Sequence, residues 1–297
     1  MRKKYVFGVF AALAMTVLVL DTQTAIQGTQ EAILLCIQTV IPTLFPFFFL
    51  SGIINQSLLG YSGKALKPLG KLCSIPKGAE PLLLLGLTGG YPVGAQAIGA
   101  AYECGYIEKE DAQRMLGFCS TAGPAFVFGL AGGLFENRWA CWILWIILIL
   151  SALITGMFLP KKETYPCKIS NSKKGKILEQ AIKSMASVCG WVVLFRVLLC
   201  FLNRWILWII PKTFAIFFAG LLELTNGCVE IHKISSPALQ FILLAGMLSF
   251  GGMCVGLQTV SVTGKLSCKT YFFGKILQTG IAMILSLIVS LFLFPGK

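Results

Sequence analysis

The residues best suited to chemistry lie in two apolar stretches that contain too much glycine and proline for ordinary membrane helices. The first holds Gly89-Gly90-Tyr91-Pro92 and then Gln96, and the second holds Ser120-Thr121 and Gly123 just before Pro124. Proline removes a backbone donor and clashes with the preceding helical turn, so each run predicts a break in a helix. The N-terminal end of a new half-helix would then direct unbonded N–H groups at an anion such as a carboxylate.

Side chains beside these breaks offer groups that suit a planar, polar solute. Tyr91 would stack on a ring or donate its hydroxyl, and Gln96 would supply an amide. Ser120 or Thr121 would cap the half-helix that begins at Pro124. Two plainer interpretations stay open: the hydroxyls can bond to their own helix, and the glycines spaced four apart in the first stretch are typical of close helix packing.

A carboxylate stands in an apolar part of the second half, where Glu223 is followed by Thr225 and Asn226. A carboxylate at membrane depth is costly, which makes it a functional-site hypothesis. Glu223 would bind a coupling H⁺ or Na⁺, or a cationic group of the substrate. The alternative is an internal ion pair with Arg196, which would also serve as the counter-charge for an anionic solute. Two glycines and an amide complete the candidates of this half: Gly251, Gly252 and Gln258.

The composition places all of these residues in a membrane. The chain has 297 residues, of which 56% are hydrophobic and 12% charged, against about 25% charged in soluble proteins. The mean hydropathy is +0.81, and the apolar residues are spread along the whole length. We therefore predict an all-α, polytopic membrane protein with one helical membrane domain that contacts the lipid bilayer.

Other classes of protein fit the composition poorly. The net charge of +13 comes mostly from lysines between the apolar stretches, which favours membrane anchoring over nucleic-acid binding. The eleven cysteines include no CxxC pair and His232 is the only histidine, so no metal centre and no cofactor is expected. No HExxH or GxSxG motif is present, and an enzyme is the least supported class.

The apolar stretches divide into plain spans and broken pairs. A first segment, residues 5–20, follows a basic start and is interpreted as a retained helix, because no A-x-A cleavage site follows it. The plain spans are residues 32–54, 139–159, 187–210 and 271–294. The broken pairs are residues 81–101 with 115–135, and residues 214–229 with 237–262.

The positive charges orient these segments. The basic start is placed in the cytoplasm, and the link from Asp21 to Glu31, which has no lysine or arginine, is placed outside. The links Lys64–Lys77 and Lys161–Lys176 are both basic and therefore inside. They flank three apolar segments, and three full crossings would put them on opposite sides. One member of the first broken pair must then be a re-entrant hairpin, and either member can take that role.

The second half repeats the same order from the opposite side of the membrane. The sequence therefore predicts an inverted repeat of two halves, each with a broken or re-entrant helix pair between plain transmembrane helices. The predicted parts are 1–31, the N-terminal helix and its outer link; 32–160, the first repeat; 161–186, a basic cytoplasmic link; and 187–297, the second repeat. This arrangement places Arg204 and Lys212 outside, against the charge rule.

Several runs resemble the nucleoside-recognition ("Gate") family, and in particular the sporulation integral membrane proteins of the YlbJ type. The resemblance covers residues 32–294 and includes two fairly specific motifs, GYPVGA and TAGP. The runs are Ile41-PTLFPFFFLSGI, Gly86-LTGGYPVGA, Ser120-TAGPAFVFG, Gly220-LLELTNG and Ser249-FGGMCVGLQ.

This resemblance implies passage of a small polar or anionic solute across the cell membrane of a sporulating bacterium, or across a membrane that surrounds the forespore. Dipicolinate, a planar dicarboxylate that spores accumulate, is the leading candidate. The alternatives are import of a nucleoside or nucleobase, and a non-transporting assembly factor of the sporulation membrane. A homo-oligomer is left open.

Overall fold

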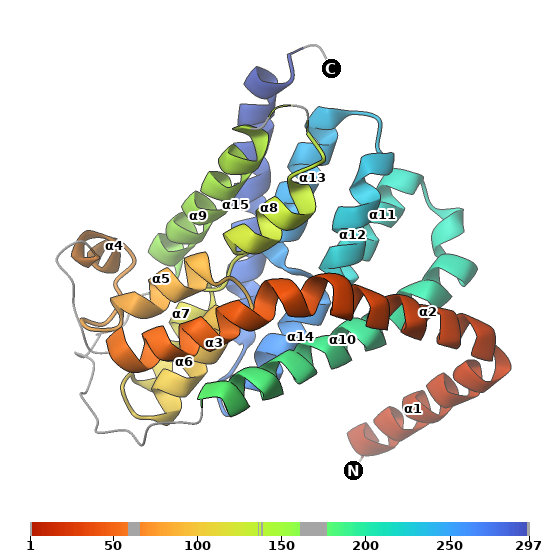
Figure 1. The fold of residues 1–297 in the computed structure, drawn as a ribbon, viewed down its shortest axis with the longest axis horizontal. Helices are drawn as coiled ribbons and strands as arrows, with labels where there is room; N and C mark the ends of the chain where they lie inside the picture. Colours follow the sequence, from red (N-terminus) through yellow and green to blue (C-terminus); the bar gives the residue numbers. More distant parts are fainter. Residues whose placement is uncertain (1, 59–65, 136, 138, 161–176, 296–297) are drawn as a thin grey trace.

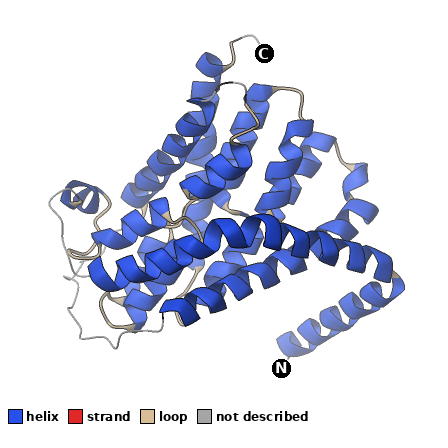
Figure 2. Ribbon diagram, in the orientation of Figure 1, coloured by secondary structure: helices blue, strands red, loops and turns tan. Residues whose placement is uncertain are grey.

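The computed structural model describes residues 2–58, 66–135, 137, 139–160 and 177–295, and these residues form helices and loops without strands (Figure 2). This confirms the all-α prediction. Lys64 and the basic link 161–176 lie outside the described residues. The α-helices are α1 Arg2–Leu20, α2 Thr22–Leu35, α3 Ile41–Leu58, α4 Lys67–Leu72, α5 Glu80–Thr88, α6 Val93–Glu103, α7 Lys109–Leu116, α8 Pro124–Ala131, α9 Trp139–Phe158, α10 Ile177–Trp205, α11 Lys212–Leu222, α12 Leu224–Glu230, α13 Pro237–Phe250, α14 Gly252–Val262 and α15 Lys269–Leu293.

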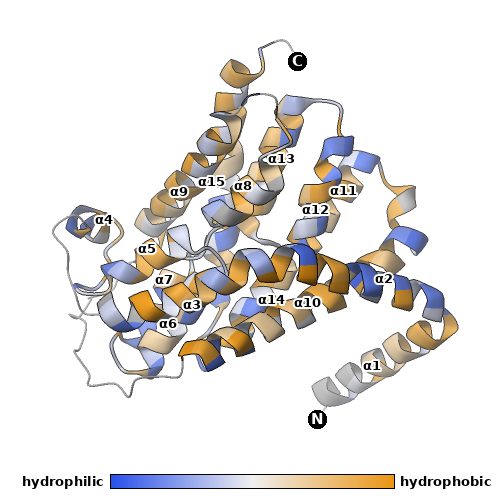
Figure 3. Ribbon diagram, viewed as in Figure 1, coloured by the Kyte–Doolittle hydropathy of each residue, from blue (hydrophilic) through white to orange (hydrophobic). Residues whose placement is uncertain are grey.

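Within the described residues, five helical stretches are long and apolar enough to cross a membrane: Thr22–Ile54, Trp139–Phe158, Ile177–Trp205, Pro237–Val262 and Lys269–Leu293. Many of their outward side chains are large and apolar, such as Ile276 and Phe292, which are 66% and 81% exposed. Figure 3 shows apolar residues along these helices. A surface of this kind is suited to lipid, and the chain is a polytopic helical membrane protein.

Residues 22–31 differ from the expected outer link, because they form the first turns of a long helix. The Asp21 side chain caps α2 by accepting a hydrogen bond from the Thr24 N–H (3.4 Å). The helix then continues through a π-helical turn, Cys36–Val40, into α3. Pro42 and Pro46 lack the N–H groups that regular helical bonds would need at this point, and π turns often accompany functional sites.

The two halves share one order of elements. A long helix (α2 to α3, or α10) precedes two interrupted segments, and a second long helix (α9 or α15) follows them. The first interrupted segment of each half is a helical hairpin with its two arms in contact. A Cβ on Gly94 would lie 2.7 Å from the Gly86 Cα, and a Cβ on Gly227 would lie 2.3 Å from the Gly220 Cα. The segments that fold back on themselves are α5–α6 in the first half and α11–α12 in the second. Which member of each pair is re-entrant in a membrane stays a prediction.

The matching long helices of the two halves pack side by side in opposite directions. A Cβ on Gly28, in α2, would lie 3.1 Å from Cys200 near the end of α10, whereas Gly52 in α3 lies against Ile177 at the start of α10. In Figure 1, α2, α3 and α10 run across the lower part of the view, and α9, α13 and α15 lie in the upper part.

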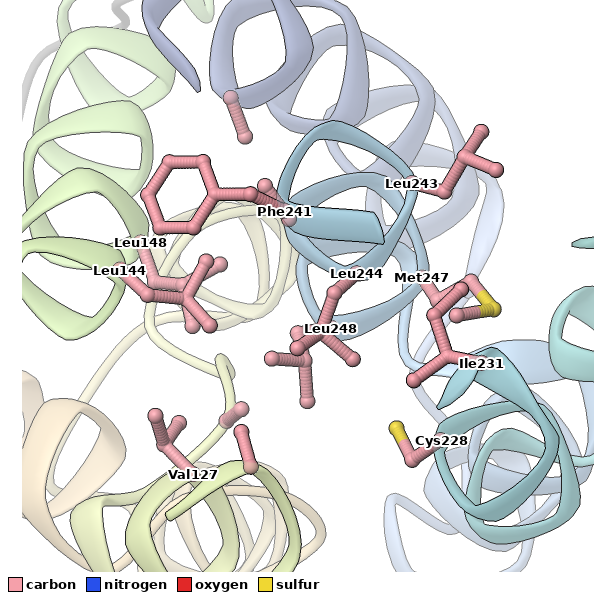
Figure 4. Packing of buried hydrophobic residues seen from close by; sticks show 14 of the residues in the cluster. Val127, Leu144, Leu148, Cys228, Ile231, Phe241, Leu243, Leu244, Met247 and Leu248 are labelled. Atoms are coloured by element: carbon pink, nitrogen blue, oxygen red, sulfur yellow. The ribbon is translucent and has the colours of Figure 1, made fainter. Parts of the chain in front are cut away.

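The largest apolar cluster surrounds α13, which lies between α9 and α12 (Figure 4). Phe241 and Leu248 of α13 are buried with Leu144 of α9 and Cys228 of α12. In a bilayer such side chains stabilise the fold through van der Waals packing, because lipid tails are as apolar as the side chains themselves. The cluster therefore holds elements of both halves against each other.

Candidate functional site

The tip of the first hairpin packs against the interruption between α7 and α8. The Tyr91 N–H donates to the Thr121 carbonyl oxygen (3.0 Å). Gly90 has a φ of +76°, and a Cβ there would lie 2.5 Å from the Gly123 nitrogen. Only glycine meets both requirements, since a side chain would be strained and would clash with backbone. The predicted break at 89–92 is thus confirmed, and its glycines allow two backbones to touch.

The interruption between α13 and α14 touches both hairpin tips. Gly251 and Gly252 have φ values of +85° and +78°. A Cβ on Gly252 would lie 3.2 Å from the Leu224 nitrogen, at the tip of the second hairpin, and a Cβ on Gly251 would lie 3.4 Å from the Tyr91 ring. Two hairpin tips and two helix interruptions therefore meet at one place, which we call the junction.

Lys275 and Gln278 of α15 form hydrogen bonds with residues of the junction, and both side chains are fully buried. The Lys275 ammonium donates to the Ser120 carbonyl, to the Ser249 carbonyl (3.2 Å) and to Gln278 Oε1 (3.0 Å). Gln278 Nε2 in turn donates to Thr121 Oγ1 (3.1 Å). Sequence reasoning missed both residues because it interpreted this segment as a plain span. The available signal was a lysine inside an apolar helix.

The expected cap of α8 by Ser120 or Thr121 is wrong. The residue that caps α8 is Gly123, and it has no side chain to contribute. Thr121 instead accepts the Gln278 amide, and the Ser120 carbonyl accepts the Lys275 ammonium. Both residues are buried. Long-range partners on α15 replace the local hydrogen bonds that sequence alone would suggest.

Glu223 forms the tip of the second hairpin and caps α12. Its Oε1 accepts from the Thr225 N–H (3.0 Å) and its Oε2 accepts from the Asn226 N–H (2.7 Å). The side chain is 2% exposed. A carboxylate at this position is stabilised by the two N–H groups and by the positive end of the helix dipole. Glu223 therefore needs no basic side chain as a hydrogen-bond partner.

Arg196 pairs with the carboxylate of Glu31 and not with that of Glu223. Its guanidinium donates through Nε (3.1 Å) and Nη2 (2.7 Å) to Glu31 Oε2, so the ion pair with Glu223, which the sequence left open as an alternative, is not the one that forms. Glu31 lies in the part of α2 that was expected to be a link, so the sequence did not suggest this pair. The pair connects α2 to α10, and both side chains remain partly exposed.

A cavity of about 100 Å³ lies at the junction. Of the predicted site residues, Tyr91, Pro92, Glu223, Thr225 and Gln258 line it, whereas Gln96 lies one turn along α6 and does not. Within the described part of the chain, the buried Tyr91 hydroxyl has no hydrogen-bond partner, which marks it as a group that a solute or water would satisfy. The wall also contains polar residues of the π-helical turn and of α3 that the sequence did not single out: Thr39 and Thr43.

Arg196 and Asn226 line a second, more polar cavity of about 370 Å³ between α10, α11 and α12. Lys212 and Lys233 also line it, as does Glu230, which is ion-paired with Lys233. We call this space the basic cavity. The first turn of α12 separates the two cavities, because Asn226 faces the basic cavity while Glu223 and Thr225 face the junction.

The fold and the junction define a polytopic helical membrane protein organised around interrupted helices. The chain is similar to the sporulation integral membrane protein YlbJ of Bacillus subtilis (strain 168), with 23% identity over 310 aligned positions that cover 86% of this chain and 75% of that protein. No protein-family model matches the chain, and no solved structure matches it. The similarity supports the predicted resemblance to proteins of the YlbJ type, and the nucleoside-recognition label stays a prediction.

Proposed function

We propose that this protein carries a small anionic solute across a membrane of a sporulating bacterium, by alternating access around the junction. The meeting of two hairpin tips and two helix interruptions at one cavity carries the proposal. Irregular backbone at membrane depth is tolerated where it is buried in protein or faces a watery cavity, and interrupted helices form the substrate sites of many transporters. The similarity to a sporulation membrane protein supports the biological setting.

The two hairpins enter the junction from opposite ends of the molecule. A Cβ on Gly264, after α14, would lie 3.0 Å from Glu103 at the end of the first hairpin. At the other end, the rings of Phe135, Phe241 and Phe294 pack with centroids 5.8, 5.8 and 5.9 Å apart. Lys77, before α5, and Lys265, after α14, lie at the first end and belong to segments that the positive-inside rule places in the cytoplasm. This geometry supports an inverted repeat whose hairpins are re-entrant from opposite faces.

Cysteine labelling in intact cells tests this orientation. Lys77 and Lys212 are both exposed and belong to opposite ends. We expect Lys212→Cys to react with a membrane-impermeant maleimide from outside, and Lys77→Cys to react only after the cells are permeabilised. The unsubstituted protein, with its native cysteines, supplies the background. Labelling of both positions from the same side would contradict the inverted repeat.

The charge of the basic cavity favours an anionic solute. Arg196, Lys212 and Lys233 bring three positive charges to its wall. Glu31 pairs with Arg196 and Glu230 pairs with Lys233, which leaves a net charge of +1 on these five residues. Such a wall attracts anions and raises their local concentration. Dipicolinate, a planar dicarboxylate, matches both this charge and the ring of Tyr91. The junction cavity is smaller than the roughly 300–1,000 Å³ of common ligand sites, so we propose that the hairpin tips separate to admit the solute. Glu223 is the proposed carrier of a coupling ion.

Uptake of radiolabelled dipicolinate into proteoliposomes tests the proposal. We expect uptake above that of empty liposomes, and a roughly twofold to tenfold loss with Tyr91→Ala, because stacking on the ring contributes about 0.5–1.5 kcal/mol. Tyr91→Phe keeps the ring and removes the hydroxyl, so it distinguishes the contributions of the two groups to uptake. Leu150→Ala, at an exposed position of α9, is the matched control and should retain full uptake.

Uptake no greater than that of empty liposomes, under both proton and sodium gradients, would contradict transport of this solute. Inhibition by uridine or adenosine, without uptake of dipicolinate, would instead favour the nucleoside alternative. A non-transporting assembly role would be favoured if sporulation stays normal with Tyr91→Ala and with substitutions of Glu223 and Asn226.

A further inference from the structure

Lys275 stands where the ends of two interrupted helices come together. The Ser249 carbonyl lies in the last turn of α13, and Ser120 lies in the interruption that follows α7. Carbonyls at helix C-termini lack the partners of a continuous helix and carry the negative end of the helix dipole. The Lys275 ammonium donates to both of these carbonyls and so joins the two halves of the molecule.

The hydrogen-bond acceptors around this side chain favour its charged form. The nitrogen has three acceptors, which are the two carbonyls and Gln278 Oε1. A neutral amine carries only two hydrogens, whereas an ammonium carries three. The rings of Tyr91 and Tyr271 each have their centroid 5.9 Å from the nitrogen, and their π faces also favour a cation. The site is thus a complete cage for one positive charge.

A close backbone contact of α15 places Lys275 at this site. A Cβ on Gly274, the residue before Lys275, would lie 2.2 Å from the Gly117 carbonyl oxygen. Helix α15 therefore approaches the residue after α7 too closely for any side chain at position 274. The lysine side chain is fully buried, so it fills the cage without access to water.

We propose that the Lys275 ammonium is a tethered substitute for the dissociable cation that transporters hold between interrupted helices. Unwound carbonyls and the C-terminal ends of half-helices are the groups that coordinate such an ion, and here a covalently attached ammonium occupies them. The consequence of this substitution for ion coupling rests on the proposed function. The protein needs no Na⁺ at this position, and the coupling ion that Glu223 carries is then a proton.

Thermal unfolding in detergent tests the tethered cation without any solute. We expect the native protein to unfold at the same Tm in NaCl and in choline chloride. Lys275→Ala should lower the Tm by about 10 °C in choline chloride, because buried carbonyls lose a charged partner. NaCl or ethylammonium chloride should restore at least half of that loss, since either cation can enter the vacated cage, whereas choline is too large. Lys269→Ala, at an exposed position on the same helix, should show no dependence on the cation.

If Lys275→Ala cannot be purified in choline chloride, the same extraction is made in NaCl and in ethylammonium chloride. Recovery of monodisperse protein in these two salts alone supports the proposal, and recovery that is equal in all three or absent from all three overturns it. A native protein whose Tm rises in Na⁺ also overturns it. These outcomes are independent of dipicolinate uptake, so failure of either proposal can be recognised without the other.

Discussion

Gly86→Ala is expected to leave little folded protein. A Cβ at this position in α5 would lie 1.8 Å from the Cys119 carbonyl oxygen and 2.6 Å from its carbon. Both atoms are backbone at the junction, so no rotation of a side chain can relieve the clash. Overpacking commonly costs about 1–3 kcal/mol, and we expect the upper end or more here. The measurement is the Tm, together with the monodisperse fraction after extraction.

Gly280→Ala is the matched control for this change. Gly280 lies within α15, and a Cβ there would meet no atom within 4 Å. Alanine is favoured over glycine inside a helix by about 1 kcal/mol, so this variant should be at least as stable as the native protein. A Gly86→Ala protein with a Tm close to that of Gly280→Ala would show that the first hairpin does not pack against Cys119 as described.

Substitutions of Glu223 are expected to separate structure from transport. Glu223→Ala removes the acceptor of the Thr225 and Asn226 N–H groups, and each buried donor left alone costs about 1–3 kcal/mol. This variant should lose both stability and uptake. Glu223→Gln keeps an acceptor for one N–H but removes the charge, so the protein should remain folded and lose at least about tenfold of gradient-driven uptake.

Paired Tm and dipicolinate uptake measurements decide this prediction. Glu179→Gln is the control, because Glu179 forms an exposed pair with Lys183 that contributes about 0.3–0.5 kcal/mol. It should change neither quantity. Full gradient-driven uptake by Glu223→Gln would exclude Glu223 as the carrier of a coupling ion, while a normal Tm for Glu223→Ala would contradict its role as the cap of α12.

The breaks were predictable because their chemistry is local. Pro92 lacks an N–H wherever it stands, and the paired glycines at 89–90 and 251–252 permit backbone that other residues resist. The long spans were predictable for a similar reason, since runs of apolar residues long enough to cross a bilayer are visible in the sequence. The start of the first long span was wrong because a segment with polar residues but no break continues as a helix once it packs on α10.

Partners distant in the chain were beyond such reasoning. Arg196 lies 165 positions from Glu31, and Lys275 lies 155 positions from Ser120. Apolar context indicated that a buried charge would need a partner, but many groups in the chain qualify. Only the packing of α10 on α2, and of α15 on the interrupted helices, brings a particular pair within hydrogen-bond distance.

The sequence by itself determined that this chain is a helical membrane protein, and where its helices break, because both depend on the polarity and backbone freedom of neighbouring residues. The tertiary structure decided which interrupted segments fold back as hairpins and that their tips share one cavity. It also decided that the Lys275 ammonium donates to the buried carbonyls of Ser120 and Ser249. These outcomes depend on which surfaces pack together, and close backbone contacts at glycines between distant segments settle that choice.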